Sequence, residues 1–302
     1  MKLKDLYKDA IKNNYAIGAY NFYNYETLKA IVDGAEESNS NLICAVSESA
    51  MKYLGSNLML MSMFKCLKTQ TKQKVYLHLD HGKSFDICAK CIDLGFDSVM
   101  IDGSNLPFEE NVKLTKKVVD YAHQRGVMVE GELGVLKGVE DDVKNETGSY
   151  TDPQQALEFV NRTQVDSLAI AIGTSHGAYK FSGEAKLRFD ILDKIQNLLP
   201  DFPLVLHGAS SVPEEIVKTF NTFGGKLENV KGVDENLLKE VSKKNIVKIN
   251  VDTDLRLAFT SEVRKMLILK RELFSPRDYL SASTKKMTEL VISKQKLFGA
   301  SK

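Results

Sequence analysis

The segment KVYLHLDHGKSFDICAKCIDLG (74–95) contains the structural unit that decides the fold. Its first part, 74–80, is a short apolar run typical of a strand that is buried on both faces. Its second part, 85–94, has helical periodicity, with Ser84 placed to cap the start and Gly95 placed to end it. The segment therefore predicts a strand followed by a helix, which is the repeating unit of parallel α/β proteins.

The same unit recurs along the chain. Eight apolar runs are each followed by a longer segment, and they predict strands at 16–21, 41–47, 74–80, 97–102, 126–132, 166–173, 203–208 and 245–251. Eight strand–helix pairs indicate a (β/α)8 TIM barrel, with an open doubly wound sheet as the alternative. No linker or composition shift divides the chain, so residues 1–302 are expected to form a single domain.

Start and stop signals place several of the helices. Pro107, Pro153 and Pro213 are expected to open helices over 107–125, 153–163 and 213–223. The first residues, MKLKDLYKDAIKNN, predict an amphipathic N-terminal helix, and two extra C-terminal helices are expected at 254–270 and 276–298.

The composition excludes several classes of protein. The chain has 41 Lys and Arg against 40 Asp and Glu over 302 residues, which gives no basic surface for nucleic acid. No apolar run approaches the roughly 18 residues of a spanning helix, and the charged start does not resemble a signal peptide. The four cysteines are too few for a disulfide framework at this length, so reduced thiols and a cytoplasmic location are expected.

One connection is unusually long. Residues 133–152 show no apolar periodicity, and we expect an irregular loop there. Long structureless loops in compact domains often act as lids over an active site. The alternative interpretation is a surface insertion without a role.

Every predicted strand carries a polar or titratable residue at its carboxyl end or within a few residues of it. In a TIM barrel these ends form one face, where catalytic groups lie. Three of the five histidines, His81, His176 and His207, lie at such ends. These ends belong to the third, sixth and seventh strands, and three imidazoles that converge on one point suit a catalytic zinc, with Asp102 and Glu132 as outer partners or as alternative metal ligands. The alternative is three separate hydrogen-bonded histidines; His78, inside its strand, is expected to be such a core residue.

Three turns at late strand ends indicate a phosphate site. GTSHG (173–177) and HGAS (207–210) expose backbone N–H groups, and NVDT (250–253) adds amide and hydroxyl donors. Arg256 and Arg277 are candidates for a second phosphate, although arginines on helix surfaces are more often solvated ion pairs. The pattern indicates a phosphorylated substrate whose other end contacts a metal.

Other chemistries remain open at this point. Lys248 shares the strand parity of Asn250 and could form a Schiff base, but such an enzyme has no need of three histidines at the rim. A zinc hydrolase is disfavoured because HLDH (78–81) has the wrong spacing for a paired HxH motif. A non-catalytic barrel that binds sugar phosphates is the third alternative.

The motifs together resemble the class II, metal-dependent fructose-bisphosphate aldolases, in the shorter bacterial-type branch that also contains the tagatose-bisphosphate aldolases. The resemblance covers nearly the whole chain, and its motifs are LHLDHG (77–82), VMIDGSNLPFEEN (99–111), VEGELG (129–134), IGTSHG (172–177), LVLHGAS (204–210) and KINVDTD (248–254).

The resemblance implies a role for each matching position. Asp80 matches the catalytic acid/base, and Glu140, in the 133–152 segment, matches a catalytic glutamate carried by a mobile lid. His81, His176 and His207 match the zinc ligands, and Asp102 and Glu132 match a second or alternative divalent site. The implied substrate contacts are Asn21, Ser47, Gly177, Lys180, Gly208, Ala209, Ser210, Asn250, Val251, Asp252, Thr253, Arg256 and Arg277, with Arg277 donated by a neighbouring subunit.

The resemblance also implies the reaction. The expected substrates are sugar and triose phosphates, with zinc as cofactor and a monovalent cation (Na+ or K+) near the dihydroxyacetone-phosphate site. Asp252 and Arg256 favour fructose 1,6-bisphosphate, because tagatose-type members tend to lack both; tagatose 1,6-bisphosphate is the alternative. A homodimer or a homotetramer is implied. The chain departs from the common pattern at Gly103 and Gly131, and GVEDD (138–142) lacks a double glycine.

Overall fold

The computed structural model describes residues 1–140, 143–145, 148–176 and 187–301. Eight parallel strands close into a barrel, in the order β1-β11-β10-β8-β5-β4-β3-β2. These strands are β1 (Ile17–Asn21), β2 (Leu42–Ser47), β3 (Val75–Gly82), β4 (Ser98–Ile101), β5 (Met128–Leu133), β8 (Ser167–Ile170), β10 (Leu204–Leu206) and β11 (Ile246–Val251). The predicted TIM barrel is confirmed, and each predicted strand lies at its expected place.

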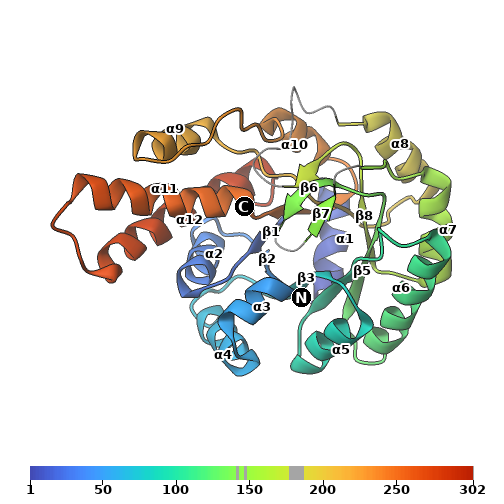
Figure 1. Ribbon diagram of the computed structural model, residues 1–302. Helices are drawn as coiled ribbons and strands as arrows, with labels where there is room; N and C mark the ends of the chain where they lie inside the picture. The colour runs from blue at the N-terminus through green and yellow to red at the C-terminus, as the bar shows by residue number, and fades with distance from the viewer. Residues whose placement is uncertain (141–142, 146–147, 177–186, 302) are drawn as a thin grey trace.

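Helices surround the barrel (Figure 1). They are α1 (Leu3–Asn13), α2 (Tyr25–Glu37), α3 (Glu48–Leu54), α4 (Asn57–Lys68), α5 (Phe85–Leu94), α6 (Phe108–His123), α7 (Pro153–Thr163), α8 (Phe189–Leu198), α9 (Glu214–Thr222), α10 (Glu235–Val241), α11 (Thr253–Leu269) and α12 (Pro276–Leu297). Among the described residues, no helix is long and apolar enough to cross a membrane.

The helix starts follow the expected capping chemistry. The Ser84 hydroxyl accepts a hydrogen bond from the Ile87 N–H, and Gly95 ends α5 at a φ of +90°. Pro153 occupies the first turn of α7, where its missing N–H has no helical partner to lose. Pro107 and Pro213 differ slightly from the prediction, because each is the N-cap residue and the helix begins one residue later.

The core has three parts. The largest lies between the strands and the outer helices. A second cluster joins α1 to the barrel, where Leu6 and Tyr7 pack with Ile17 and Tyr76. A third, of Met100, Ala169 and Val205, lies among the strands. Apolar side chains therefore hold the barrel together, and the polar groups at the carboxyl ends of the strands stand on a rigid frame.

The 133–152 segment is more ordered than its sequence indicates. Residues 137–140 (β6) and 143–145 (β7) form an antiparallel pair, and β6 also pairs in parallel with β9 (Ser175–His176). The expectation of an irregular loop was wrong for these residues. The strands are too short to show periodicity, and β9, which pairs with β6, lies 38 residues farther along the chain, with Ser175 opposite Lys137.

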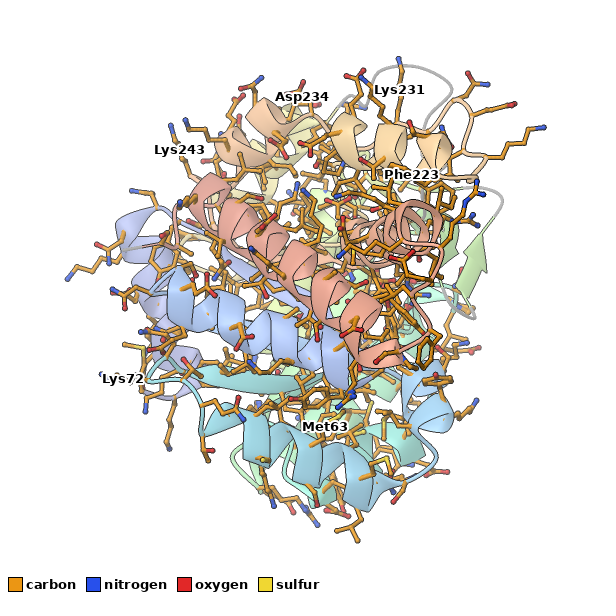
Figure 2. All side chains as sticks on the ribbon, turned by 90° about the vertical axis from the view of Figure 1, so that its left-hand side faces the viewer. Met63, Lys72, Phe223, Lys231, Asp234 and Lys243 are labelled. Carbon is orange, nitrogen blue, oxygen red and sulfur yellow. The ribbon has the colours of Figure 1, made fainter. Side chains whose placement is uncertain are left out.

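The helix α12 packs on the outside of the barrel, against β1 and between the helices α2 and α11. The Gln295 Oε1 atom accepts hydrogen bonds from the Gly18 N–H at 3.1 Å and from the Tyr20 hydroxyl at 3.2 Å. Gly34 of α2 allows close packing, since a Cβ there would lie 2.4 Å from a Val291 methyl group. Figure 2 views the molecule from this side, where the two long helices α11 and α12 lie across the front.

Candidate active site

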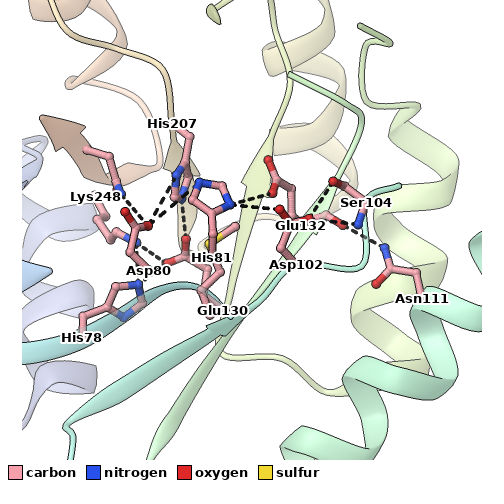
Figure 3. Close-up of polar contacts among 12 residues, drawn as sticks. His78, Asp80, His81, Asp102, Ser104, Asn111, Glu130, Glu132, His207 and Lys248 are labelled. Carbon is pink, nitrogen blue, oxygen red and sulfur yellow. Dashed lines mark hydrogen bonds and ion pairs between the residues drawn. The ribbon is translucent and has the colours of Figure 1, made fainter. Parts of the chain in front are cut away.

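The Asp80 carboxylate is the centre of a polar cluster at the carboxyl ends of the strands (Figure 3). It accepts hydrogen bonds from the Asn21 side-chain amide at 2.7 Å and from the Asn250 amide at 3.1 Å. The carbonyl oxygens of these two asparagines are buried and have no hydrogen-bond partner among the described residues. Asp80 is therefore held from two sides, and two buried acceptors remain for a ligand with hydroxyl groups.

Two histidines face the same carboxylate. The Asp80 Oδ1 atom lies 4.0 Å from His81 Nε2 and 3.9 Å from His207 Nδ1. The two imidazole rings meet edge to face, with centroids 4.6 Å apart. His81 has a φ of +47°, which is uncommon for a residue other than glycine and is frequent at functional sites. The strand end therefore turns sharply so that both Asp80 and His81 reach the cluster.

The other face of His81 meets two carboxylates. Its Nδ1 atom lies 3.0 Å from Asp102 Oδ2 and 3.6 Å from Glu132 Oε2. Asp102 is fixed in turn by the N–H of Ser104 at 3.0 Å and by its hydroxyl. Since Asp102 and Glu132 face Nδ1, they orient the ring and leave Nε2 on the side of Asp80 and His207.

A buried chain of polar groups lies beneath His207. The Glu130 carboxylate contacts His207 Nε2 at 2.8 Å and the Lys248 ammonium at 2.6 Å. Lys248 also lies 3.0 Å from His78 Nε2, and His78 Nδ1 lies 2.7 Å from the Ser98 hydroxyl. His78 is thus the hydrogen-bonded core histidine that the sequence predicted. The Lys248 ammonium is fully buried against Glu130, which does not suit a Schiff-base nucleophile.

These surroundings shift the acidities in opposite directions. Burial, the charge of Lys248 and the neighbouring histidines lower the pKa values of His78 and His207 well below the usual range, although Glu130 and Asp80 partly oppose this. Burial also disfavours a charge on His81, but Asp80, Asp102 and Glu132 outweigh it and raise its pKa to about 10. Burial opposes ionisation of Asp80, yet the histidines, Lys248 and Asn21 together lower its pKa.

The donor atoms fit a divalent metal. One ligand atom from each of Asp80, His81 and His207 lies within 4.8 Å of the others, and the same holds for His81, Asp102 and Glu132. A set of imidazole nitrogens and carboxylates suits zinc. Each histidine also has one ring nitrogen that points away from Asp80 and contacts a carboxylate: His81 Nδ1 contacts Asp102, and His207 Nε2 contacts Glu130.

The turn after β10 is folded tightly. Gly208 has a φ of +61°, and a Cβ at this position would lie 2.8 Å from the Ser175 backbone. Ala209 and Ser210 are buried. This close approach brings the predicted HGAS and TSH turns together. The N-terminus of α11 follows β11, which is the neighbour of β10 in the barrel. Turns and a helix N-terminus in this arrangement suit the predicted phosphate site.

The N-terminus of α11 carries the predicted sugar-discriminating pair. The single N–H of Arg256 Nε is shared between the two Asp252 carboxylate oxygens, at 2.9 and 2.8 Å. The Arg256 guanidinium lies 5.4 Å from the centre of the Tyr23 ring, beside Ser49 and Tyr53 in a cavity of about 490 Å³. Asn250 and Val251 end β11, Thr253 begins α11, and Ser47 ends β2 as the N-cap of α3.

Not every predicted residue joins the cluster. Arg277 is exposed in the first turn of α12, at the projecting end of the α11–α12 hairpin, and no described contact links it to Asp80 (Figure 1). The side chains of Glu140 and His176, and all of Gly177 and Lys180, lie outside the described residues. The backbone of His176 is paired with Gly138, which puts the predicted lid beside the predicted third ligand.

Two features of this cluster are not among the sequence predictions: the role of Glu130, and the ion pair that Glu130 forms with Lys248. The sequence does contain evidence for Glu130 and Lys248, because each is a charged residue inside an otherwise apolar strand. Glu130 lies two residues before Glu132, and Lys248 lies two residues before Asn250. Because side chains alternate along a strand, each points to the same face as that site residue. Gly131 between the two glutamates faces outward, and a Cβ there would lie 2.8 Å from Phe159 of α7. Its presence is thus explained by close helix–strand packing.

Comparison with known proteins agrees with this geometry. The model of the family "Fructose-bisphosphate aldolase class-II" matches residues 1–302. A fructose-bisphosphate aldolase from Treponema pallidum is 46% identical, over 97% of this chain and 94% of its own length. One from Helicobacter pylori is 43% identical, over 99% and 98%. The crystal structure of the YdjI aldolase from Escherichia coli K12 superimposes with a TM-score of 0.78 at 30% identity, covering 99% of this chain and 97% of that one.

Proposed function

The chain belongs to the class II fructose-bisphosphate aldolase family, and on that premise we propose that it cleaves fructose 1,6-bisphosphate reversibly into dihydroxyacetone phosphate and glyceraldehyde 3-phosphate. The observation that carries the proposal is the convergence of Asp80, His81 and His207, held by Asn21, Asn250 and Glu130. This arrangement combines a fixed base with nitrogen ligands for a metal in one buried place.

Zinc is the proposed cofactor, and His81, His176 and His207 would hold it. A bound divalent ion supplies Lewis-acid polarisation of the substrate carbonyl and its neighbouring hydroxyl. Asp102 and Glu132 fix the His81 ring through Nδ1 and form the candidate second or alternative site. Glu130 fixes the His207 ring through Nε2. A monovalent cation near the phosphate turn is part of the same proposal.

Asp80 is the proposed general base for cleavage. It takes the proton from the hydroxyl whose carbon becomes the aldehyde, and the two asparagine amides keep its carboxylate pointed at that hydroxyl. Glu140 is proposed to give a proton to the carbon that bond breakage releases. Glu140 is the last residue of β6. We propose that residues 133–152, which include β6 and β7, act as a lid, and that closure of this lid would deliver Glu140 to the substrate.

The two phosphates of the substrate have separate proposed sites. The first is the turn Gly208 to Ser210 with Asn250 to Thr253 and, outside the described residues, Gly177 and Lys180. The second is Ser47 and Arg256, whose guanidinium is aligned by Asp252. We propose fructose 1,6-bisphosphate as the substrate because tagatose-type members tend to lack both Asp252 and Arg256; the two sugars differ at one hydroxyl, so a small change in the pocket would suffice to select between them.

We also propose a homo-oligomer in the cytoplasm. The tip of the α11–α12 hairpin exposes Leu267, Ile268, Leu269 and Phe274, and Phe274 is 91% accessible. Exposed apolar groups in one place usually mark an interaction surface, and Arg277 lies beside them. A second copy that covers this tip would receive Arg277 near its own site.

The test is cleavage of fructose 1,6-bisphosphate and of tagatose 1,6-bisphosphate in parallel, before EDTA treatment, after it, and after zinc is restored. Activity on the fructose substrate that EDTA abolishes and zinc recovers is the expected result. A preference for the tagatose substrate would keep the mechanism and overturn the interpretation of Asp252 and Arg256. Activity that survives complete metal removal and is lost on borohydride treatment would refute the metal mechanism.

A further inference from the structure

A second buried ionic group lies behind the proposed phosphate turn, outside the Asp80 cluster. The Lys294 ammonium comes from α12 and is 1% exposed, and the Asp254 carboxylate comes from α11 and is 0% exposed. Their charged atoms are 3.2 Å apart. Lys294 also contacts the Ser211 hydroxyl and, at 2.9 Å, the Glu235 carboxylate of α10. A fully buried lysine is unusual, so these contacts need an explanation.

The Asp254 carboxylate is bonded to the backbone of the turn. It accepts hydrogen bonds from the Ser211 N–H at 3.0 Å and from the Val212 N–H at 2.8 Å. These two residues directly follow Ser210 of the proposed phosphate site. Both carboxylate oxygens are therefore used to fix the backbone, and Lys294 neutralises the charge that this requires.

The backbone that Asp254 holds is in an unfavourable conformation. Val212 has a φ of +50°, and a β-branched residue in this region is a genuine outlier. It also precedes Pro213, where an extended conformation is preferred. The turn would relax toward another shape without an external constraint.

The opposite side of the turn is closed as well. A Cβ on Gly232 would lie 2.3 Å from the Ser211 carbonyl oxygen, and the Val233 N–H donates to the Ser210 carbonyl at 3.1 Å. This segment leads into α10, whose first residue is Glu235. Lys231 and Asp234, labelled at the top of Figure 2, mark its position. The turn is thus clamped between the 232–235 segment and the Lys294–Asp254 pair.

We propose that Lys294 and Asp254 are positioning residues, which hold the strained turn 208–212 in the shape that receives a phosphate of the substrate. The inference rests on the proposed phosphate site at Ser210. Neither residue touches the substrate; they act through the backbone N–H groups of Ser211 and Val212.

The test measures the dissociation constant of dihydroxyacetone phosphate by calorimetry on the zinc-loaded enzyme, well below its melting temperature. Lys294→Met should weaken binding about tenfold, the scale of a lost hydrogen bond to a charged group, with unchanged zinc content. Asp254→Asn should act similarly, because it replaces one of the two oxygens that accept the Ser211 and Val212 N–H groups by an NH2 donor. The matched control is Lys286→Met on the same helix, which should bind as the wild type does.

Val212→Gly separates positioning from general destabilisation. Glycine adopts a positive φ readily, so this change alone should leave binding within about twofold and should restore part of the affinity lost in Lys294→Met. The effects of Lys294→Met and Ser210→Ala should also overlap, so that the double variant loses less than the product of the two single effects.

Each outcome bears on one part of the proposal. Normal binding by Lys294→Met and Asp254→Asn, together with weak binding by Ser210→Ala, would overturn the inference and leave the phosphate site standing. Normal binding by all of these variants, Ser210→Ala included, would show that the turn does not receive the phosphate, and this inference would fall together with the phosphate site. If Lys294→Met does not fold, Asp254→Asn with and without Val212→Gly gives the same comparison.

Discussion

At the scale of single residues, the site depends on buried charges that are each matched by a partner. Asp80 is surrounded by two amide donors and two imidazoles, and Glu130 is placed between His207 and Lys248. A carboxylate that is already aligned and already desolvated needs little rearrangement when a substrate arrives. The same arrangement makes the loss of any one partner costly, because the other charge stays buried.

The first prediction concerns Asp80. Asp80→Ala should keep its zinc and lose turnover by a factor of about 10² to 10⁴, as expected when a general acid/base is removed. Metal analysis and cleavage kinetics check this, with the exposed Asp86→Ala as control. Since Asp80 lies within 4.8 Å of the donor atoms of His81 and His207, loss of zinc from Asp80→Ala would show that it is a ligand instead.

The second prediction concerns the Lys248–Glu130 pair. Lys248→Met should lower the free energy of unfolding of the metal-free protein by about 3–5 kcal/mol, because Glu130 is left buried and unpaired. Lys248→Met combined with Glu130→Gln should recover most of this loss. Denaturant unfolding measures both, and Lys244→Met, which breaks the more exposed pair with Asp193, should cost no more than about 1 kcal/mol. An equal cost for the single and double variants would contradict the pairing.

At the scale of elements, the strands were predictable and the small hairpin was not. Strands such as β2 and β10 are short, almost entirely apolar runs, and burial on both sides demands that pattern. The pair β6 and β7 has three or four residues a strand and depends on pairing with β9, so no local pattern reveals it. The burial of Lys294 could not be predicted either. Its helix also carries the exposed lysines Lys285 and Lys296, and nothing in the local sequence distinguishes the buried lysine from them.

The third prediction concerns the C-x-x-C segment of α5. Burial raises the pKa of Cys91 to about 12 and raises the pKa values of Cys44 and Cys88 further, whereas Cys66 is exposed. A thiol-specific reagent should therefore modify one thiol per native chain, and four after unfolding. Cys66→Ser should remove the native reaction. Modification of Cys88 or Cys91 in the folded protein, detected by mass spectrometry, would contradict their role as packing residues.

At the scale of the whole molecule, the barrel frame and the order of the site residues followed from the sequence, but their contacts did not. The strand ends placed Asp80, His81 and His207 on one face because parallel strands all end there. The pairing of Asp102 with His81, and of Glu130 with His207, depends on side-chain directions that the sequence does not encode locally.

The fourth prediction concerns assembly. Leu269→Asp combined with Phe274→Asp should reduce the mass of the particle in light scattering, since both side chains lie on the apolar tip of the α11–α12 hairpin. Leu58→Asp, at an exposed position of α4, is the control and should leave the mass unchanged. An unchanged mass for the double variant would exclude the tip as the contact between copies.

The place of α12 in the chain has a consequence for biosynthesis. A ribosome makes all eight barrel strands before it makes residues 276–297. Until that helix emerges, the Gly18 N–H has no Gln295 acceptor and Asp254 has no Lys294 counter-charge. The barrel can therefore collapse while it is still tethered, but its phosphate turn cannot be locked at that stage. A nascent chain stalled before α12 should be compact and should fail to retain phosphorylated ligands.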